Sequence, residues 1–109
     1  MDILFKDRRL ERLCREEKKM VRELGASVAK KLKARLKDLS AANHMGEIKT
    51  GRPHLLTGNF SGCMALDLGG LIRLVFEAAD DPLPFRSDNS IDWFKVTRVR
   101  VVFIGDYHG

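Results

Sequence analysis

The sequence lacks the features that mark membrane, secreted and metal-stabilised proteins. None of its apolar stretches approaches the roughly 20 residues that a spanning helix needs, and charges interrupt the N-terminal segment MDILFKDRRL where a secretory signal would be apolar. It has only two cysteines, Cys14 and Cys63, and its three histidines lack the spacing of zinc ligands. We therefore expect a cytoplasmic protein with buried free thiols, no bound metal and no membrane contact.

Charge is plentiful in this chain, and it is unevenly distributed. Residues 1–49 carry 14 lysines and arginines against 8 acidic residues, whereas residues 50–109 carry 6 against 7. Apolar residues make up 44% of the 109 residues and charged residues 32%, which suits a single globular domain over residues 1–109. A basic half is typical of a surface that binds a polyanion, although lysine-rich helices also serve solubility alone.

The N-terminal half predicts a strand and two helices. A short strand at residues 1–5 precedes Asp7, a candidate N-cap, and apolar residues then recur at helical spacing as far as Gly25. Ser27 could cap a second helix, whose apolar stripe ends at Leu39. The other faces of that helix carry five basic residues: Lys30, Lys31, Lys33, Arg35 and Lys37.

The C-terminal half has the pattern of a β-sheet. Residues 40–62 form a connection with a short strand near residues 54–56, and CMALDL, Gly69-Gly70 and LIRLVFE have the alternation and the turn of a hairpin. After a polar loop, residues 96–104 alternate again and predict a long strand. This order indicates an α+β fold, in which two helices cover one face of a small antiparallel sheet and leave the other face open.

Period-two geometry places arginines on the open face. The apolar positions of the last strand would face the helices; they are Val99, Val101 and Phe103. Arg98 and Arg100 would then share the open face with Arg73 of the hairpin, where planar guanidiniums match the oxygens of a phosphate. Exposed arginines are also commonly solvated and paired with acidic residues, and this second interpretation stays open.

The chain ends in GDYHG, with three groups that can give or take protons. A histidine titrates near neutral pH, and the carboxylate of Asp106 could orient His108 or raise its pKa. A terminal histidine is also commonly a frayed end or a purification remnant. His54, in a loop with glycine and proline, is by itself no more than a surface residue.

Three segments in this order resemble one protein family. They are HLLTGNFSG (54–62), LIRLVFE (71–77) and DYH (106–108), and they follow two charged helices, with DWFKVT (92–97) after the polar loop. Over nearly the whole chain this pattern resembles HigB-type toxins of the RelE/ParE toxin–antitoxin superfamily. The resemblance implies a RelE-like (microbial ribonuclease-like) domain, the toxin of a type II pair, which enters the ribosomal A site and cleaves messenger RNA without a cofactor.

The resemblance also implies roles for single residues. His54 matches the histidine before the hairpin, Arg73 the arginine of the third strand, and Asp106, Tyr107 and His108 the C-terminal trio. The histidines would serve as base and acid, in either order, while the 2′-hydroxyl attacks the adjacent phosphate. Arg73 would stabilise the developing charge, Tyr107 could stack on a base, and the basic helix and the arginines of the last strand would contact RNA.

One segment departs from the family pattern. Relatives commonly read LKGDRKG where this chain reads LTGNFSG, so Thr57, Asn59, Phe60 and Ser61 remove three cations from the loop. Two other functions therefore stay open: a non-catalytic toxin-fold module that binds an antitoxin or nucleic acid, and a ParE-like gyrase inhibitor. The implied partners are a helix-turn-helix antitoxin, the ribosome and messenger RNA, with operator DNA bound only through the antitoxin complex.

Overall fold

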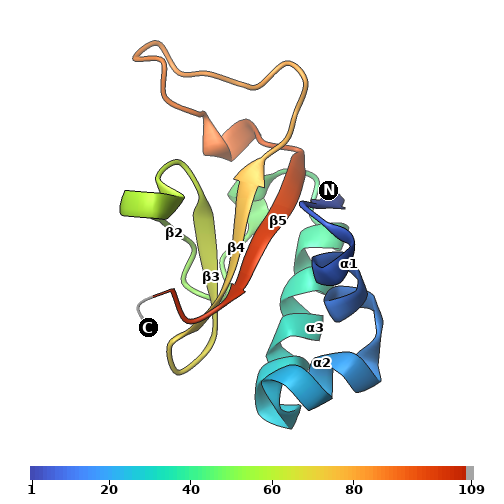
Figure 1. Cartoon of the computed structure of the whole chain (residues 1–109). Coiled ribbons are helices and arrows are strands. Elements are labelled where there is room, and N and C mark those ends of the chain that lie inside the picture. Colours follow the sequence, from blue (N-terminus) through green and yellow to red (C-terminus); the bar gives the residue numbers. More distant parts are fainter. Residues whose placement is uncertain (108–109) are drawn as a thin grey trace.

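A five-stranded sheet carries its three α-helices on one face (Figure 1). This computed structural model describes residues 1–107. Its elements are β1 (Asp2–Phe5), α1 (Arg8–Arg15), α2 (Glu17–Leu24), α3 (Ala26–Ala41), β2 (His54–Leu55), β3 (Met64–Gly69), β4 (Ile72–Ala78) and β5 (Arg98–Gly105), with short 3-10 helices at Met45–Glu47, Gly58–Phe60 and Trp93–Lys95.

The sheet has the strand order β1-β5-β4-β3-β2. The strands β2 to β5 pair in antiparallel fashion, whereas β1 lies parallel to β5, with Ile3 opposite Val99. The α+β prediction is confirmed, and so is the face on which the helices lie. The parallel pair is a correction to the purely antiparallel sheet that the sequence predicted.

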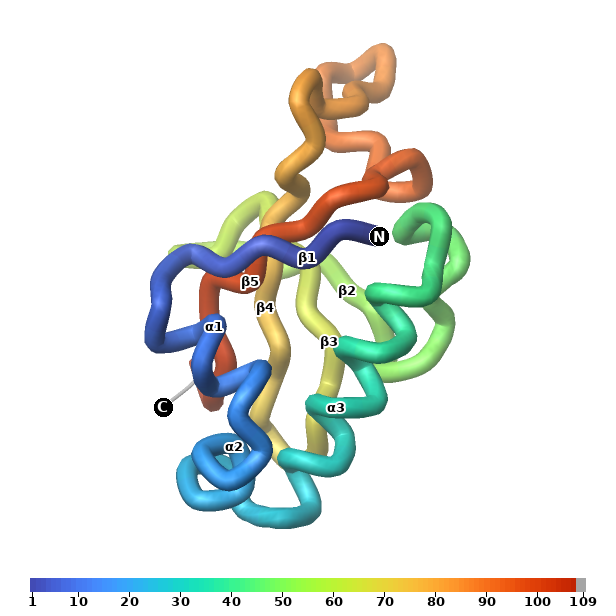
Figure 2. The backbone as a smooth tube through the Cα atoms, turned by 90° about the vertical axis from the view of Figure 1, so that its right-hand side faces the viewer, coloured from blue at the N-terminus to red at the C-terminus, as the bar shows by residue number. Residues whose placement is uncertain are grey.

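The single helix predicted between Asp7 and Gly25 is wrong, because two helices occupy this span. Asp7 does cap α1, and its carboxylate accepts a hydrogen bond from the backbone N of Leu10 at 2.9 Å. Glu16 then adopts an extended backbone, with φ −103° and ψ 104°, which ends α1. An unbroken helix here would be about 25 Å long. The break lets α1 pack against β1 and β5 while α2 packs against α3 (Figure 2).

The predicted basic helix is present as α3, and its start differs slightly from the prediction. Gly25, with φ 84°, separates it from α2, so α3 begins at Ala26 and Ser27 lies within its first turn. The glycine suits this junction because a positive φ strains other residues. Within residues 1–107, none of the helices is long and apolar enough to cross a membrane.

The main core lies between the helices and the sheet. Its buried side chains come from every layer and include Leu10, Leu13, Leu32, Leu39, Leu66, Leu74, Phe76, Val99 and Val101. The predicted orientation of the last two is confirmed. Each fully buried side chain of this size contributes about 1.5–3 kcal/mol through the hydrophobic effect, so this layer holds the sheet in position.

A β-bulge changes the orientation of the end of β5. The pairs Phe76–Val101 and Val75–Phe103 leave Val102 as an extra residue on β5. Phe103 therefore lies on the open face with Val75, and the prediction that it faces the helices is wrong. The alternation in the sequence could not reveal the bulge, since Val102 and Phe103 are both apolar.

Both cysteines are free. Cys63 is buried in the small apolar cluster of the open face, and Cys14 is partly buried beside the main core. Burial raises the pKa of Cys14 to about 12 and also raises the pKa of Cys63. Both thiols therefore stay protonated at neutral pH and behave as small hydrophobic side chains, as the sequence predicted.

Candidate functional site

Three arginines converge on Asp67 in β3. The Nε of Arg52 donates to Oδ2 of Asp67 at 2.8 Å, and its Nη2 donates to Oδ1 at 3.3 Å. The Nε of Arg73 lies 2.8 Å from Oδ1 as an ion pair. Arg35 of α3 donates from its Nε to the backbone carbonyl of Asp67 at 3.3 Å. One carboxylate on the open face thus holds the guanidiniums of Arg52 and Arg73.

The β3–β4 hairpin positions Asp67 and Arg73. The two residues are direct cross-strand partners, and the turn between them uses Gly69 at φ 116° and Gly70 at φ 56°. Arg73 is only 7% exposed, and its Nη1 donates to the carbonyls of Gly70 at 2.8 Å and Ile72 at 3.2 Å. The turn therefore fixes the guanidinium that follows it, and only part of its donor set is available to a ligand.

Arg52 reaches Asp67 from a second turn, which is fastened to β3. The backbone N of Asp67 donates to the carbonyl of Gly51 at 2.7 Å. Gly51 has φ 89°, and Arg52 itself has φ 52°, which is uncommon for a residue with a side chain. The Arg52 side chain is 62% exposed, in contrast to Arg73. Its guanidinium can therefore exchange Asp67 for a dissolved anion without unfolding the sheet.

The cluster fixes the charge of Asp67. Partial burial alone would raise the pKa of this carboxyl. The hydrogen bond from Arg52 and the positive charges of Arg73, Arg52 and His54 outweigh that effect and hold the pKa of Asp67 below its ordinary value. At neutral pH the carboxylate is therefore ionised, and it neutralises part of the positive charge on this face.

His54 lies on the same face as Arg73. It pairs with Ala65, which belongs to the apolar cluster of the open face, and its charge acts on Asp67. The Nδ1 of His54 lies 2.8 Å from the carbonyl oxygen of Arg52. Because a carbonyl can only accept, Nδ1 carries the hydrogen, which leaves Nε2 as the atom that can take up a proton. The fold brings these two predicted site residues together.

An apolar shelf lies beside this charged cluster. Its buried members are Leu56, Cys63, Ala65 and Val75. The ring of Phe60 lies 5.2 Å from that of Phe103 and 6.1 Å from that of Tyr107, between centroids. Tyr107 also contributes electrostatically to the pKa of Arg52, after the larger effect of Asp67, so the phenol lies near the cluster. A shelf of aromatic rings is a surface on which nucleobases stack.

The rest of the C-terminal trio is only partly described. Asp106 follows β5 directly and is half-buried. His108 lies outside the described residues. The prediction that His54 and His108 share one groove therefore stays a prediction.

Arg98 and Arg100 do not join the Asp67 cluster. Arg100 donates from Nη1 to Oε2 of Glu77 at 2.7 Å, and Nη2 of Arg98 lies 3.5 Å from Oδ2 of Asp2. Glu77 is four residues beyond Arg73 on β4, about 13 Å along the strand. The paired, solvated interpretation of these two arginines fits the observed contacts, and a phosphate site shared with Arg73 would need a ligand that spans this distance.

The basic residues of α3 divide into two groups. Lys30, Lys33 and Lys37 are exposed on the helical side of the sheet, opposite the face that carries His54, and Lys33 pairs with Glu17 at 2.8 Å. Lys31 and Arg35 point toward the hairpin instead. A Cβ placed on Gly69 would lie 3.5 Å from Nζ of Lys31, and Arg35 bonds to Asp67. Only this second group borders the candidate site.

Sequence reasoning missed Arg52 and Asp67. Asp67 could have been found by counting from the Gly69-Gly70 turn, since the hairpin places it opposite Arg73. Nothing in the sequence distinguishes Arg52 from other exposed arginines. Within residues 1–107, no three His, Cys, Asp or Glu side chains lie where they could hold a metal ion.

Comparison with solved structures shows which proteins share this fold. The YoeB/ParE toxin from Agrobacterium tumefaciens matches with a TM-score of 0.59 at 11% identity, covering 98% of this chain and 99% of that one. The YoeB-YefM complex from Staphylococcus aureus matches with a TM-score of 0.57 at 16% identity over 96% and 94%. The YoeB dimer from Staphylococcus aureus gives 0.56 at 17% identity over the same shares.

No protein-family model matches the sequence, and a comparison with curated proteins finds no relative. The likeness is therefore one of structure, and it extends over nearly the full length of each chain. The three helices and the mostly antiparallel sheet have the fold of YoeB/ParE-type toxins.

Proposed function

We propose that this chain is the toxin of a type II toxin–antitoxin pair and that it cleaves messenger RNA on the ribosome in the cytoplasm. One observation carries the proposal: Asp67 gathers Arg52, Arg73 and His54 on a sheet face that the helices leave uncovered. Cations, a proton acceptor and an aromatic shelf are what RNA cleavage requires of a protein surface. The neighbouring toxin folds support the same function.

His54 is the proposed general base. Its Nδ1–H is held by the carbonyl of Arg52, so Nε2 can accept the proton of a ribose 2′-hydroxyl. The deprotonated oxygen attacks the adjacent phosphorus, and the bond from phosphorus to the 5′-oxygen breaks. The products are a 2′,3′-cyclic phosphate and a free 5′-hydroxyl. The proton on the departing oxygen comes from an acid in the C-terminal trio, for which His108 is the candidate.

The two guanidiniums stabilise the negative charge that develops on the phosphate. Arg73 is rigid because the hairpin turn and Asp67 hold it, and a preorganised cation loses little energy in reorientation. Arg52 is exposed and can turn from Asp67 to a phosphate oxygen. It is the proposed substitute for the three cations that the loop lacks, where Thr57, Phe60 and Ser61 stand in place of the Lys, Arg and Lys of relatives. Tyr107 and Phe60 offer the stacking surface for a base.

The proposed partner is a cognate antitoxin of the helix-turn-helix type, with operator DNA bound only through the complex. Among the structures with this fold, a YoeB toxin is recorded together with YefM. Neutralisation by a partner explains how a cell could carry the gene of a ribonuclease that attacks its own messengers.

Expression of the chain alone tests the proposal. We expect growth arrest and cleavage of messengers during translation, together with 5′-hydroxyl ends at the cut sites. His54→Gln should abolish cleavage while the protein stays folded by circular dichroism. His44→Gln is the matched control, since His44 lies beside Phe94 and outside the cluster. Normal growth and intact messengers with folded protein present would reject the proposal.

A non-catalytic toxin-fold module is the second candidate. It is favoured by one observation: Asp67 and the turn carbonyls already occupy much of the donor set of Arg73. In that case the His54→Gln variant keeps whatever phenotype the wild-type chain produces. Arrest without cut messengers, accompanied by loss of DNA supercoiling, would instead indicate a ParE-like gyrase inhibitor.

A further inference from the structure

The outer edge of β1 has no strand partner within residues 1–107. The backbone N of Asp2 donates to Thr97 at 3.3 Å and that of Lys6 donates to Val101 at 2.9 Å, both toward β5. Because the direction of backbone groups alternates along a strand, the N–H and C=O of Ile3 and Phe5 point to the outer edge. No group in the described residues bonds to them there. Such an edge is a template for another strand.

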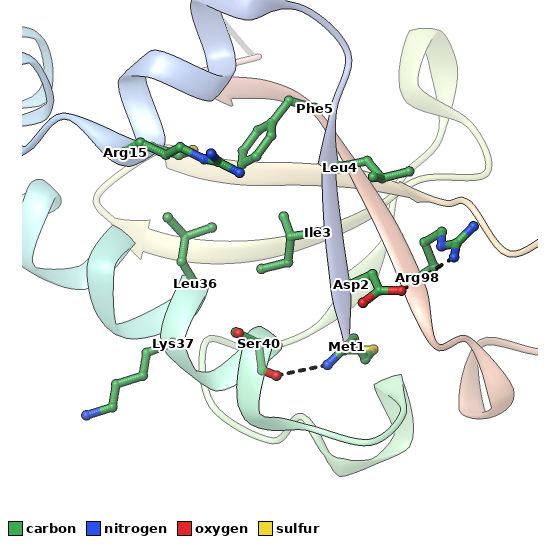
Figure 3. Close-up of a pocket in the computed structure, with 11 residues that line it drawn as sticks. Met1, Asp2, Ile3, Leu4, Phe5, Arg15, Leu36, Lys37, Ser40 and Arg98 are labelled. Carbon is green, nitrogen blue, oxygen red and sulfur yellow. Dashed lines mark hydrogen bonds and ion pairs between the residues drawn. The ribbon is translucent and has the colours of Figure 1, made fainter.

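Two grooves adjoin this edge, and both are lined by the side chains of β1. On the helical side a groove of about 830 Å³ has an apolar lining formed by Ile3, Phe5, Cys14 and Leu36. Figure 3 shows Ile3 and Phe5 on one side of β1, toward Leu36 and Arg15, and Leu4 on the other side. A second groove of about 540 Å³ runs from α1, where Arg8 and Glu11 line it, past Leu4, which is 37% exposed, to Arg100. A strand added here would lie beside both grooves, with its side chains pointing alternately to the two faces of the sheet.

The rims of both grooves are predominantly basic. Their cations are Arg8, Arg15, Lys37, Arg98 and Arg100, and their acidic residues are Asp2, Asp7 and Glu11. Arg15 pairs with Glu11, Arg98 with Asp2 and Arg100 with Glu77, which lies outside the two linings. Neither Arg8 nor Lys37 has an acidic partner in the part of the chain that the structure describes. The unbalanced charge favours an acidic occupant and disfavours a second copy, which would bring the same cations together.

We propose that the free edge of β1 docks an extended acidic segment of a partner protein, which joins the sheet as a further strand. Backbone hydrogen bonds to Ile3 and Phe5 give the affinity, apolar side chains enter the two grooves, and carboxylates meet Arg8 and Lys37. The identification of this partner as the antitoxin rests on the proposed function. The docking site itself follows from the edge, the grooves and the charge.

A synthetic heptapeptide that alternates glutamate and valine, with blocked ends, tests the proposal on the full chain. We expect saturable binding by NMR titration, with the largest shifts at the amides of Ile3 and Phe5 and slower hydrogen exchange at both. A lysine–valine peptide of the same length should bind about tenfold more weakly. The same acidic peptide with N-methylated backbone amides should not bind, since it lacks the donors of a strand.

Two charge reversals on α3 form a matched pair. Lys37→Glu, at the groove, should weaken the binding of the acidic peptide about fivefold. Lys30→Glu, on the same helix but outside the groove, should leave the affinity for the peptide unchanged. Both lysines are exposed, so both variants should fold.

The proposal is overturned if the acidic peptide does not bind, if it binds no better than the lysine peptide, or if its shifts lie away from β1. Sedimentation of the free chain as a dimer whose contacts include Ile3 and Phe5 would also overturn it, since a second copy would then occupy the edge. None of these measurements involves RNA or ribosomes. If the chain cuts messengers but does not bind the peptide, only the docking site is refuted. If it binds the peptide but does not cut messengers, only the ribonuclease activity is refuted.

Discussion

Asp67 determines how the charges of the open face are arranged. Its pKa is depressed in the folded protein, so its ionisation stabilises the fold at pH values above the unfolded value of about 3.9. That stabilisation is lost as the pH falls through the lower, folded pKa. Breaking the pair would leave Arg73, which is 7% exposed, with an unbalanced charge.

We expect Asp67→Asn to lower the free energy of unfolding by about 1.5–3 kcal/mol at pH 7, the usual contribution of hydrogen bonds to charged groups. The difference from the wild type should shrink below about pH 4, because the wild-type carboxyl then becomes protonated and equally neutral. Urea denaturation at several pH values measures both effects. The control is Asp38→Asn, at an exposed position of α3. If the difference in unfolding free energy between Asp67→Asn and the wild type stayed constant down to pH 2, the ionised Asp67 would not be its cause.

Arg52 differs from Arg73 in exposure, and this predicts a different response to substitution. The test uses a single-stranded RNA with 2′-O-methyl groups, which cannot be cleaved. If Arg52 contacts a phosphate of this RNA, Arg52→Ala should reduce the slope of log affinity against log salt by about 0.7. Stability should change little, since the side chain is 62% exposed. Arg22→Ala, at an exposed position of α2 on the helical side of the sheet, should leave the slope unchanged. If the wild type and both variants gave equal slopes, Arg52 would not contact a phosphate of the RNA.

At the scale of single elements, the hairpin between β3 and β4 is the part of the site that the sequence predicted best. The Gly69-Gly70 turn and the alternation on both sides identify the strands and place Arg73 on the open face. The same reasoning failed where a single residue redirects the chain. Glu16 is a good helix former, yet it adopts an extended backbone because α1 and α2 pack on different partners.

The turn glycines should respond differently to one substitution. Gly70 has φ 56°, in the left-handed region that asparagine tolerates, and no atom lies within 4 Å of a Cβ placed there. Gly69 has φ 116°, which a residue with a side chain rarely adopts. Gly69→Asn should therefore cost about 1–3 kcal/mol of unfolding free energy, and Gly70→Asn should cost well under 1 kcal/mol. Thermal denaturation of the two variants compares them, and an equal loss would show that the turn is not constrained in this way.

At the scale of the whole molecule, the proposed docking edge and the proposed general base, His54, lie on opposite edge strands of the sheet. β1 is one edge strand and β2, which carries His54, is the other, so about 19 Å of sheet separates them. Electrostatic screening has a length of about 8 Å at physiological ionic strength, so carboxylates at β1 should act weakly on Arg52 and Arg73.

We therefore expect the acidic heptapeptide and a 2′-O-methyl RNA to bind the chain simultaneously. Saturation with the peptide should change the RNA dissociation constant less than about twofold at 0.15 M salt, and more at low salt, where screening is weak. Fluorescence anisotropy of labelled RNA, with and without peptide, measures this. Competition at physiological salt would mean that the RNA path also covers β1, and the arginines near that edge, Arg98 and Arg100, would then belong to the RNA-binding surface after all. Independent binding would mean that a partner docked only at β1 cannot by itself cover His54, so neutralisation would require a segment that continues across the open face.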